Sequence, residues 1–226
     1  MIDDVVVDGW KRVFLDDGYH VLMRISTFLL TFLLAGCDSA TAPPPVSDTT
    51  SFEAELSPWT AVAIDTGSNG AAHASWSVNR TNVSSTDGNW SAQLRAYNGT
   101  DAVKVWLERR FELPTSATDT WDVSISYDFG TSDEGAFNLW RIVAGAFAEA
   151  PRSADALAPA FRGETGGATS NGTLRWLNRT YTARVQTSER HLYVVVGVWG
   201  TYETERAYLI DNLRVSITPR RRTSAE

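Results

Sequence analysis

Apolar and polar residues alternate with a period of two along much of the chain after residue 51. In segment 103–113 the odd-numbered positions are mostly apolar and the even-numbered ones mostly polar, and segment 121–129 alternates in the same way. Because successive side chains of a β-strand point to opposite faces, this period predicts strands with one buried face. We expect these two strands to pair across a connection at 114–119. Further strands are predicted at 52–56, 59–64, 74–78, 91–97, 136–147, 173–178, 181–186, 191–199 and 207–217.

Turn-forming residues divide the chain into these short segments. Gly, Asn, Asp or Pro interrupts the alternation about every 8–15 residues, and no helix of ordinary length is indicated. Residues 51–218 amount to about 170 residues, enough for one domain with a sizeable core. The pattern predicts an all-β fold in which two antiparallel sheets pack as a β-sandwich. At 148–170 the alternation gives way to Ala, Pro, Gly and Ser, which predicts a loop over one edge of the sandwich with a helical turn at 153–157.

A short apolar run precedes the only cysteine of the chain. Residues 25–34 fall short of the ~20 that span a bilayer but fit the ~7–15 of a signal-peptide core. The following Leu34-Ala35-Gly36-Cys37 resembles the lipobox of bacterial lipoproteins. This resemblance implies that 23–36 is a signal peptide and that a lipid on Cys37 anchors the exported protein to the inner or outer membrane of a bacterial cell envelope.

The composition of the flanking segments completes this organisation. Residues 37–50 are polar and Pro-rich after the cysteine, which predicts a flexible tether. Residues 1–22 carry five Asp against Lys11 and Arg12, which suits a signal peptide poorly. We expect this extension to be absent from the mature protein, either removed with the signal or preceding a true start at Met23. The basic segment 219–226 is interpreted as a disordered, solvated tail.

The net charge is acidic and argues against nucleic acid as a partner. The formal charge is −7, and 17 basic and 22 acidic residues remain from Cys37 onward. Binding to a phosphate backbone needs a basic surface. Arg220-Arg221-Arg222 belong to the short tail and do not supply one.

The sequence does not indicate a catalytic centre. Only His73 and His191 follow Cys37, and no serine lies in a nucleophile-elbow motif. Asp133-Glu134 and the acidic pair at 203–205 are predicted to be loop charges rather than the rigid carboxylate pair of a glycosidase. We therefore expect the protein not to be an enzyme.

Three groups of residues, in their order along the chain, resemble a known family. They are Phe52-Glu53 followed by Trp59, the segment Asp87-Gly88-Asn89-Trp90-Ser91-Ala92-Gln93-Leu94, and the segment Tyr208-Leu209-Ile210-Asp211-Asn212-Leu213-Arg214-Val215. This order resembles the galactose-binding-like jelly rolls of carbohydrate-binding modules, over nearly the whole mature domain. The resemblance implies a jelly-roll sandwich whose terminal strand lies beside the first.

The same resemblance implies a structural calcium ion between the first and last strands. Glu53 and Asp211 would supply carboxylate oxygens and Asp87 a further oxygen, and calcium takes 6–8 oxygen ligands. The alternative is that Asp211 only hydrogen-bonds a turn and Glu53 is a surface charge.

Aromatic residues on the polar faces of predicted strands indicate a ligand surface. Trp106 shares a strand face with Arg110, and Tyr97 shares one with Arg95. Aromatic rings among planar polar groups suit the recognition of a sugar. The predicted ligand-binding residues are Arg95, Tyr97, Trp106, Arg110, Trp140 and Tyr193, and the predicted ligand is a glycan.

Two alternatives to this glycan surface remain open. The aromatics could instead pack beneath the 148–170 loop as a satellite cluster. The domain could also be a structural or adhesion domain that contacts protein. Trp59, Trp121 and Trp176 are predicted to be core residues.

Overall fold

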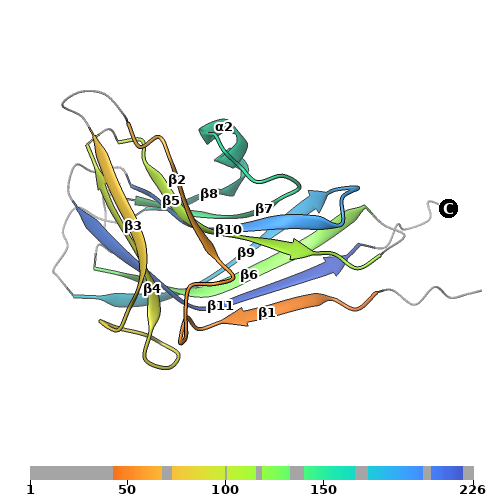
Figure 1. Ribbon diagram of the computed structural model, residues 1–226, viewed down its shortest axis with the longest axis horizontal. Coiled ribbons are helices and arrows are strands. Elements are labelled where there is room, and N and C mark those ends of the chain that lie inside the picture. The colour runs from red at the N-terminus through yellow and green to blue at the C-terminus, as the bar shows by residue number, and fades with distance from the viewer. Residues whose placement is uncertain are drawn as a thin grey trace, which may run out of the picture. The chain divides into compact units, whose positions relative to one another are not determined.

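The computed structural model describes residues 43–67, 73–99, 101–115, 119–132, 140–165, 173–200 and 205–220. These residues belong to one unit, Ala42–Glu226. Two antiparallel sheets pack face to face, as the sequence predicted (Figure 1). Cys37 and the predicted signal peptide lie outside the described residues. Within the described part of the chain, no helix is both long and apolar enough to cross a membrane.

The larger sheet has six strands in the order β3-β4-β11-β6-β9, with β1 pairing along β11. Both β1 and β4 pair with the same side of β11, because β4 pairs with residues 206–210 and β1 with residues 213–217. A bulge in the pairing of β11 with β6, between Asp211 and Arg214, marks the change of partner. Asn212 in this bulge has a φ of 49°. The strands are β1 (Val46–Thr50), β3 (Ala74–Thr81), β4 (Ser91–Asn98), β6 (Thr120–Thr131), β9 (Arg175–Gln186) and β11 (Arg206–Pro219).

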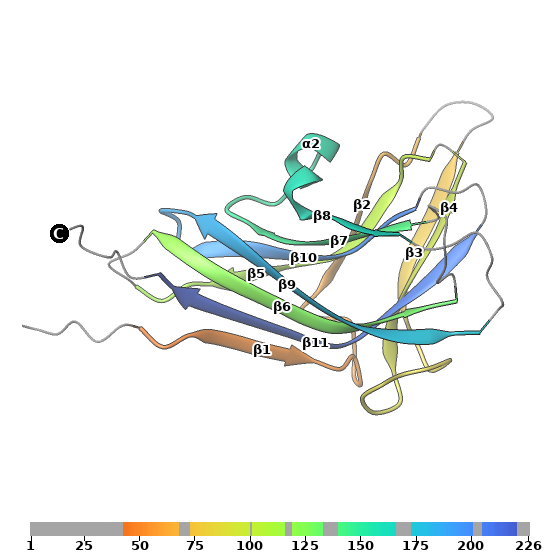
Figure 2. The ribbon, with the colours of Figure 1, turned by 180° about the vertical axis from the view of Figure 1, so that it is seen from behind.

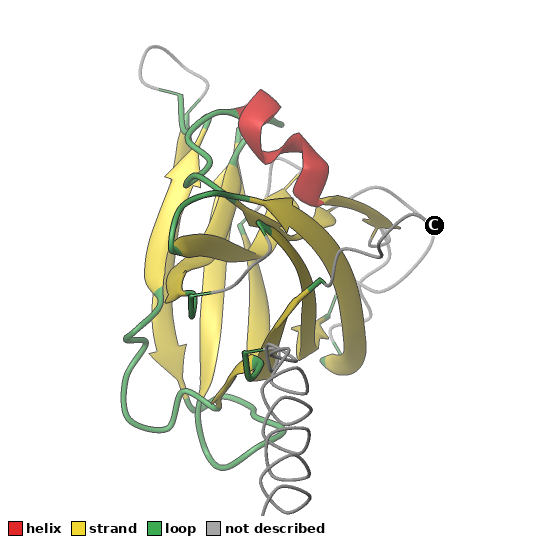
Figure 3. Cartoon of the chain, turned by 90° about the vertical axis from the view of Figure 1, so that its right-hand side faces the viewer, coloured by secondary structure: helices red, strands yellow, loops and turns green. Residues whose placement is uncertain are grey.

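The second sheet has five strands in the order β2-β5-β10-β7-β8. On the outside of this sheet, the short helix α2 (Ala154–Leu157) and the 3-10 turn η1 (Ala158–Ala160) precede β8 (Figure 3). We call residues 153–161 the cover. Ser153 caps α2 by accepting a 3.2 Å hydrogen bond from the backbone N–H of Ala156, so the predicted helical turn is confirmed. The strands are β2 (Thr60–Ile64), β5 (Lys104–Glu112), β7 (Trp140–Phe147), β8 (Phe161–Thr165) and β10 (His191–Gly200).

The main core lies between the two sheets and follows the predicted alternation. Val103, just before β5, and Val105 and Leu107 on the inner face of β5 are buried, and Trp59 and Trp121 are buried in the same cluster. Trp176 is only half-buried on β9. A second, smaller cluster lies between the cover and the outer face of the five-stranded sheet. The satellite cluster considered from the sequence is therefore present.

Four predictions about strands and their pairing are wrong. Segments 103–113 and 121–129 do not pair with each other, because β5 lies in the five-stranded sheet and β6 in the six-stranded one. Residues 52–56 form a loop, and 173–178 with 181–186 form the single strand β9. Part of the predicted tether is β1, because Val46–Thr50 pairs with β11 and Asp48 lies 2.5 Å from Arg109 of the opposite sheet.

The pairings define two ends of the sandwich. Val46 lies beside Ile217, and Leu113 donates a backbone hydrogen bond to Arg190, just before β10 begins. We call this the tether end, because β1 enters the fold there. We call the other end, where β10 finishes at Trp199 and Gly200, the far end. Figures 1 and 2 show β1 beginning and β11 finishing at the same end of the sandwich.

Candidate functional site

The outer face of the five-stranded sheet presents its side chains in rows that cross the strands. Four such rows follow one another along the strands, the first at the far end and the last at the tether end. They are Ile64–Lys104–Trp199–Arg141, then Val62–Trp106–Gly197–Val143, then Thr60–Glu108–Val195–Gly145, and finally Arg110–Tyr193–Phe147. The cover lies against the second and third rows, where Trp106, Val143 and Val195 join Leu157 and Ala160 in the smaller cluster. Only the first and last rows can therefore offer an accessible site.

Trp106 is fully buried beneath the cover. Its cross-strand neighbour Gly197 makes room for it, since a Cβ at Gly197 would lie 2.5 Å from the Cβ of Trp106. The indole N–H of Trp106 points to Glu108 at 3.4 Å. This burial rules out the predicted role of Trp106 as an open stacking platform.

Arg152, immediately before the cover, pairs with Glu108. Its two terminal nitrogens each donate a 2.6 Å hydrogen bond to one of the two carboxylate oxygens of Glu108. The Glu108 side chain is 7 % exposed and that of Arg152 is 57 % exposed. Hydrogen bonding to Glu108 raises the pKa of Arg152 above its ordinary value, against the opposing effect of burial. This ion pair holds the cover over Trp106.

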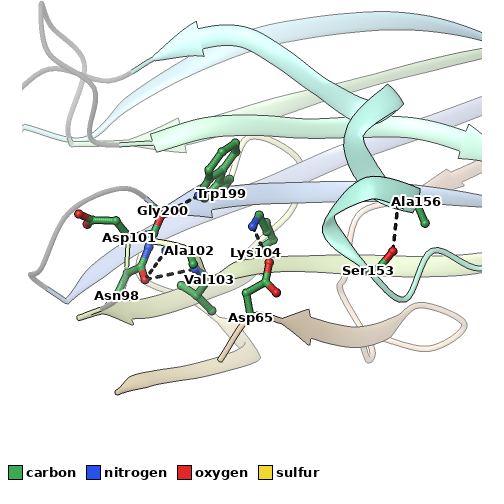
Figure 4. Close-up of polar contacts among 10 residues, drawn as sticks. All are labelled: Asp65, Asn98, Asp101, Ala102, Val103, Lys104, Ser153, Ala156, Trp199 and Gly200. Atoms are coloured by element: carbon green, nitrogen blue, oxygen red, sulfur yellow. Dashed lines mark hydrogen bonds and ion pairs between the residues drawn. The ribbon is translucent and has the colours of Figure 1, made fainter. Parts of the chain in front are cut away.

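The first row holds an aromatic ring between two cations at the far end. The Lys104 ammonium lies 4.6 Å from the ring centroid of Trp199, and the Arg141 guanidinium carbon lies 5.1 Å from it. Phe161, from the first residue of β8, places its ring 5.0 Å from that of Trp199. Asp65 accepts a 2.5 Å hydrogen bond from Lys104 (Figure 4). We call these five residues the Trp199 cluster.

Local hydrogen bonds fix the position of Trp199. Its indole N–H donates to the backbone carbonyl of Asp101 at 3.1 Å. The loop that carries Asp101 is held by Asn98, whose side-chain oxygen accepts from the backbone N–H of Ala102 at 3.0 Å and of Val103 at 3.2 Å (Figure 4). The side-chain amide of Asn98 also donates to the Gly200 carbonyl. These hydrogen bonds therefore fix the orientation of the half-buried Trp199 ring.

The residues predicted to bind ligand do not form one surface. Trp140 lies between the sheets, 1 % exposed, with its ring 4.9 Å from that of Phe129, so its predicted role is wrong. Arg95 and Tyr97 lie on β4, on the outer face of the other sheet. Arg110 and Tyr193 are cross-strand neighbours at the tether end of the five-stranded sheet.

The sequence prediction did not include the Trp199 cluster among the ligand residues. One signal for it was available, because the alternation of 191–199 puts Trp199 on the same face as Tyr193. Pairing with Lys104 and Arg141 could not be deduced, because it depends on β10 lying between β5 and β7.

Two of the predicted calcium ligands, Glu53 and Asp211, accept hydrogen bonds from the backbone of one loop. One carboxylate oxygen of Glu53 accepts hydrogen bonds from the backbone N–H groups of Asn89 and Trp90, at 2.9 and 2.8 Å. One oxygen of the buried Asp211 accepts from the backbone N–H groups of Thr86 and Asp87, at 2.6 and 2.9 Å. Both carboxylates thus accept hydrogen bonds from backbone N–H groups of the 84–90 loop.

No group of three or more His, Cys, Asp or Glu side chains within the described ranges could hold a metal ion. Glu53 attaches the 84–90 loop to the loop between β1 and β2, and Asp211 attaches it to β11 of the six-stranded sheet.

A shallow depression of about 400 Å³ lies on the outer face of the six-stranded sheet. Hydroxyl groups of Ser124, Thr182 and Ser216 line it together with Arg184 and Asp122. Arg184 donates a 3.0 Å hydrogen bond to Asp122, so these charges already have partners. No aromatic ring lines the depression, which makes it a poorer candidate for sugar binding than the Trp199 cluster.

Comparison with known proteins finds likeness only at the level of structure. No protein-family model matches the chain, and none of the curated proteins does. Among solved structures, a cleaved adhesin domain of Lys-gingipain from Porphyromonas gingivalis W83 is 12 % identical with a TM-score of 0.43, covering 79 % of this chain and 100 % of that one. The CBM22-1 xylan-binding domain of Paenibacillus barcinonensis Xyn10C is 14 % identical with a TM-score of 0.36, covering 81 % and 100 %.

A Stig cyclase, Fisc from Fischerella sp. TAU, is 14 % identical with a TM-score of 0.39, covering 79 % of this chain and 100 % of that one. Binding proteins and an enzyme thus occur at the same low level of likeness. At these identities the likeness shows the fold alone.

Proposed function

We propose that this chain is a non-catalytic carbohydrate-binding domain and that the Trp199 cluster binds the sugar. The observation that carries the proposal is the composition of the first row and its neighbours. The rings of Trp199 and Phe161, 5.0 Å apart, offer apolar surface for the C–H groups of a pyranose. Arg141 supplies hydrogen-bond donors, and Asp65, which the buried Lys104 holds in place, supplies an acceptor.

We further propose that a lipid on Cys37 anchors the domain to a membrane of the bacterial envelope. In the described fold, β1 begins at the tether end, whereas the Trp199 cluster lies at the far end of β10. An anchor at Cys37 would direct the tether end to the membrane and leave the far end accessible to a ligand. The two proposals are therefore compatible, because the proposed anchor and the proposed sugar site lie at opposite ends of the domain.

A glycan array probed with the purified full chain, followed by calorimetric titration of the best ligand, tests sugar binding. Trp199→Ala should weaken that ligand about 10- to 100-fold, as expected for an anchor side chain. Trp199→Phe, which keeps a ring, should lose less. Tyr193→Ala is the matched control, because Tyr193 lies on the same strand face at the tether end.

Melting curves of all variants separate lost binding from lost folding. If no saccharide binds, or if Trp199→Ala binds as the wild type does, the glycan proposal is wrong. Binding of a protein without any saccharide would favour the adhesion alternative. Metabolic labelling with a radioactive fatty acid tests the anchor, since Cys37→Ser should abolish the label.

A further inference from the structure

The cationic side chains on the outer face of the five-stranded sheet differ in whether they have an ion-pair or hydrogen-bond partner. Lys104 pairs with Asp65 at 2.5 Å, and Arg152 pairs with Glu108 at 2.6 Å. Arg110 lies 3.2 Å from Glu112 and from a ring nitrogen of His191. Arg141 has no ion pair or hydrogen bond through its side chain to any residue in the described ranges, and only its contact with Trp199 holds it.

The contact with Trp199 leaves the hydrogen-bonding capacity of Arg141 unused. A guanidinium attracted to an aromatic face is held through its charge, while its five N–H donors remain in the plane of the group. Those donors match the two oxygens of a carboxylate, and such bidentate pairs are among the stronger hydrogen bonds. Trp199 is itself fixed by the Asp101 carbonyl, so Arg141 stands beside a pre-positioned ring.

We propose that Arg141 recognises a carboxylate on the bound sugar, so that the Trp199 cluster prefers glycans that contain uronic acids. This inference rests on the proposed sugar-binding function and adds the class of ligand. Lys104 does not duplicate the role of Arg141, because Asp65 neutralises it. The cluster as a whole then has two cations and one carboxylate, and a single ligand carboxylate balances the charge.

The probes are oligomers of galacturonate, glucuronate and mannuronate, each compared with its carboxyl-reduced counterpart, titrated against the purified full chain. The reduced sugars keep the ring and the linkage and lose only the charge. At least one uronate oligomer should bind about 10-fold more tightly than its reduced counterpart, a factor that corresponds to ~1.4 kcal/mol. This preference should shrink as the salt concentration rises from 50 to 500 mM.

Arg141→Gln should abolish the preference, so that each uronate oligomer and its reduced counterpart bind this variant equally, and Arg141→Lys should restore part of the preference. Arg110→Gln, on the same sheet face at the tether end, is the control and should retain the full preference. Equal binding of acidic and reduced sugars would overturn this inference and leave the glycan proposal standing. Failure of every saccharide, or binding of polyglutamate alone, would overturn both.

Discussion

Arg152 forms a bidentate ion pair with Glu108, in which each terminal nitrogen donates a 2.6 Å hydrogen bond to one carboxylate oxygen. Because Glu108 is almost fully buried, removing Arg152 leaves a carboxylate without its counter-charge beside Trp106. We expect Arg152→Ala to lower the free energy of unfolding by about 1–2 kcal/mol, less than for a fully buried pair, since Arg152 is half-exposed. Urea unfolding monitored by tryptophan fluorescence measures this.

Two further variants separate the buried charge from other effects of this change. Adding Glu108→Gln to Arg152→Ala should recover part of the loss, because a neutral amide costs less to bury than a charge. Arg184→Ala, which breaks the exposed pair with Asp122, should cost only ~0–1 kcal/mol. An equal cost for Arg152→Ala and Arg184→Ala would show that the Glu108 pair does not stabilise the cover.

The strands β5 and β10 approach each other closely at Gly197. A Cβ there would lie 2.2 Å from the Val105 carbonyl oxygen and 2.5 Å from the Cα of Trp106, so backbone would have to move. Gly197→Ala should destabilise the domain by about 3 kcal/mol or more. Gly163→Ala is the matched control, because nothing lies within 4 Å of a Cβ at that position of the edge strand β8. Thermal melts of the two variants should differ clearly, and similar melts would contradict the packing seen at Gly197.

Trp106 illustrates how far the sequence could predict the structure. Alternation along 103–113 correctly identified the inner face of β5, because that pattern depends only on neighbouring positions. The outer face was expected to be polar and open, but Lys104 and Glu108 are also buried. Their burial comes from Asp65 and from the cover, which lie elsewhere in the chain. A strand's own sequence does not reveal what a later segment places on it.

Strand pairing was the second feature that the sequence did not predict correctly. A hairpin between β5 and β6 was the simplest expectation for neighbouring segments, yet the chain passes from one sheet to the other between them. The strand β1 was also missed, because Asp48 and Thr50 on its inner face are polar, and the charge of Asp48 is balanced by Arg109 of β5. The Trp199 cluster needs β2, β5, β7 and the start of β8 around β10, so no local motif could identify it.

Truncation of Trp106 should now cost about as much stability as truncation of a tryptophan in the main core. Trp106 is 0 % exposed and Trp121 is 3 % exposed. We expect Trp106→Ala and Trp121→Ala each to cost ~3–5 kcal/mol in urea unfolding. Trp106→Ala should also loosen the cover, so limited proteolysis should cut within 153–161 faster than in Trp121→Ala. A mild effect of Trp106→Ala would mean that the ring is not packed as described.

Asp128 makes the attachment of the 84–90 loop sensitive to acid. Burial alone would raise its pKa, but hydrogen bonds from Thr86, Asn178 and Asn212, with the charge of Arg214, bring the pKa below its usual value. A carboxylate whose pKa is lowered by folding stabilises the fold above the pKa of the unfolded chain, ~3.9. This contribution disappears as the pH falls through the folded pKa.

Asp128→Asn should therefore destabilise the domain at pH 7, and its difference from the wild type should shrink as the pH falls below ~4. Urea unfolding between pH 7 and pH 2.5 measures that difference directly. Asp155→Asn is the control, because no described residue hydrogen-bonds or ion-pairs with the Asp155 carboxylate. This control should leave the pH profile unchanged, and a constant gap between Asp128→Asn and the wild type would exclude Asp128 as the acid-sensitive contact of the loop.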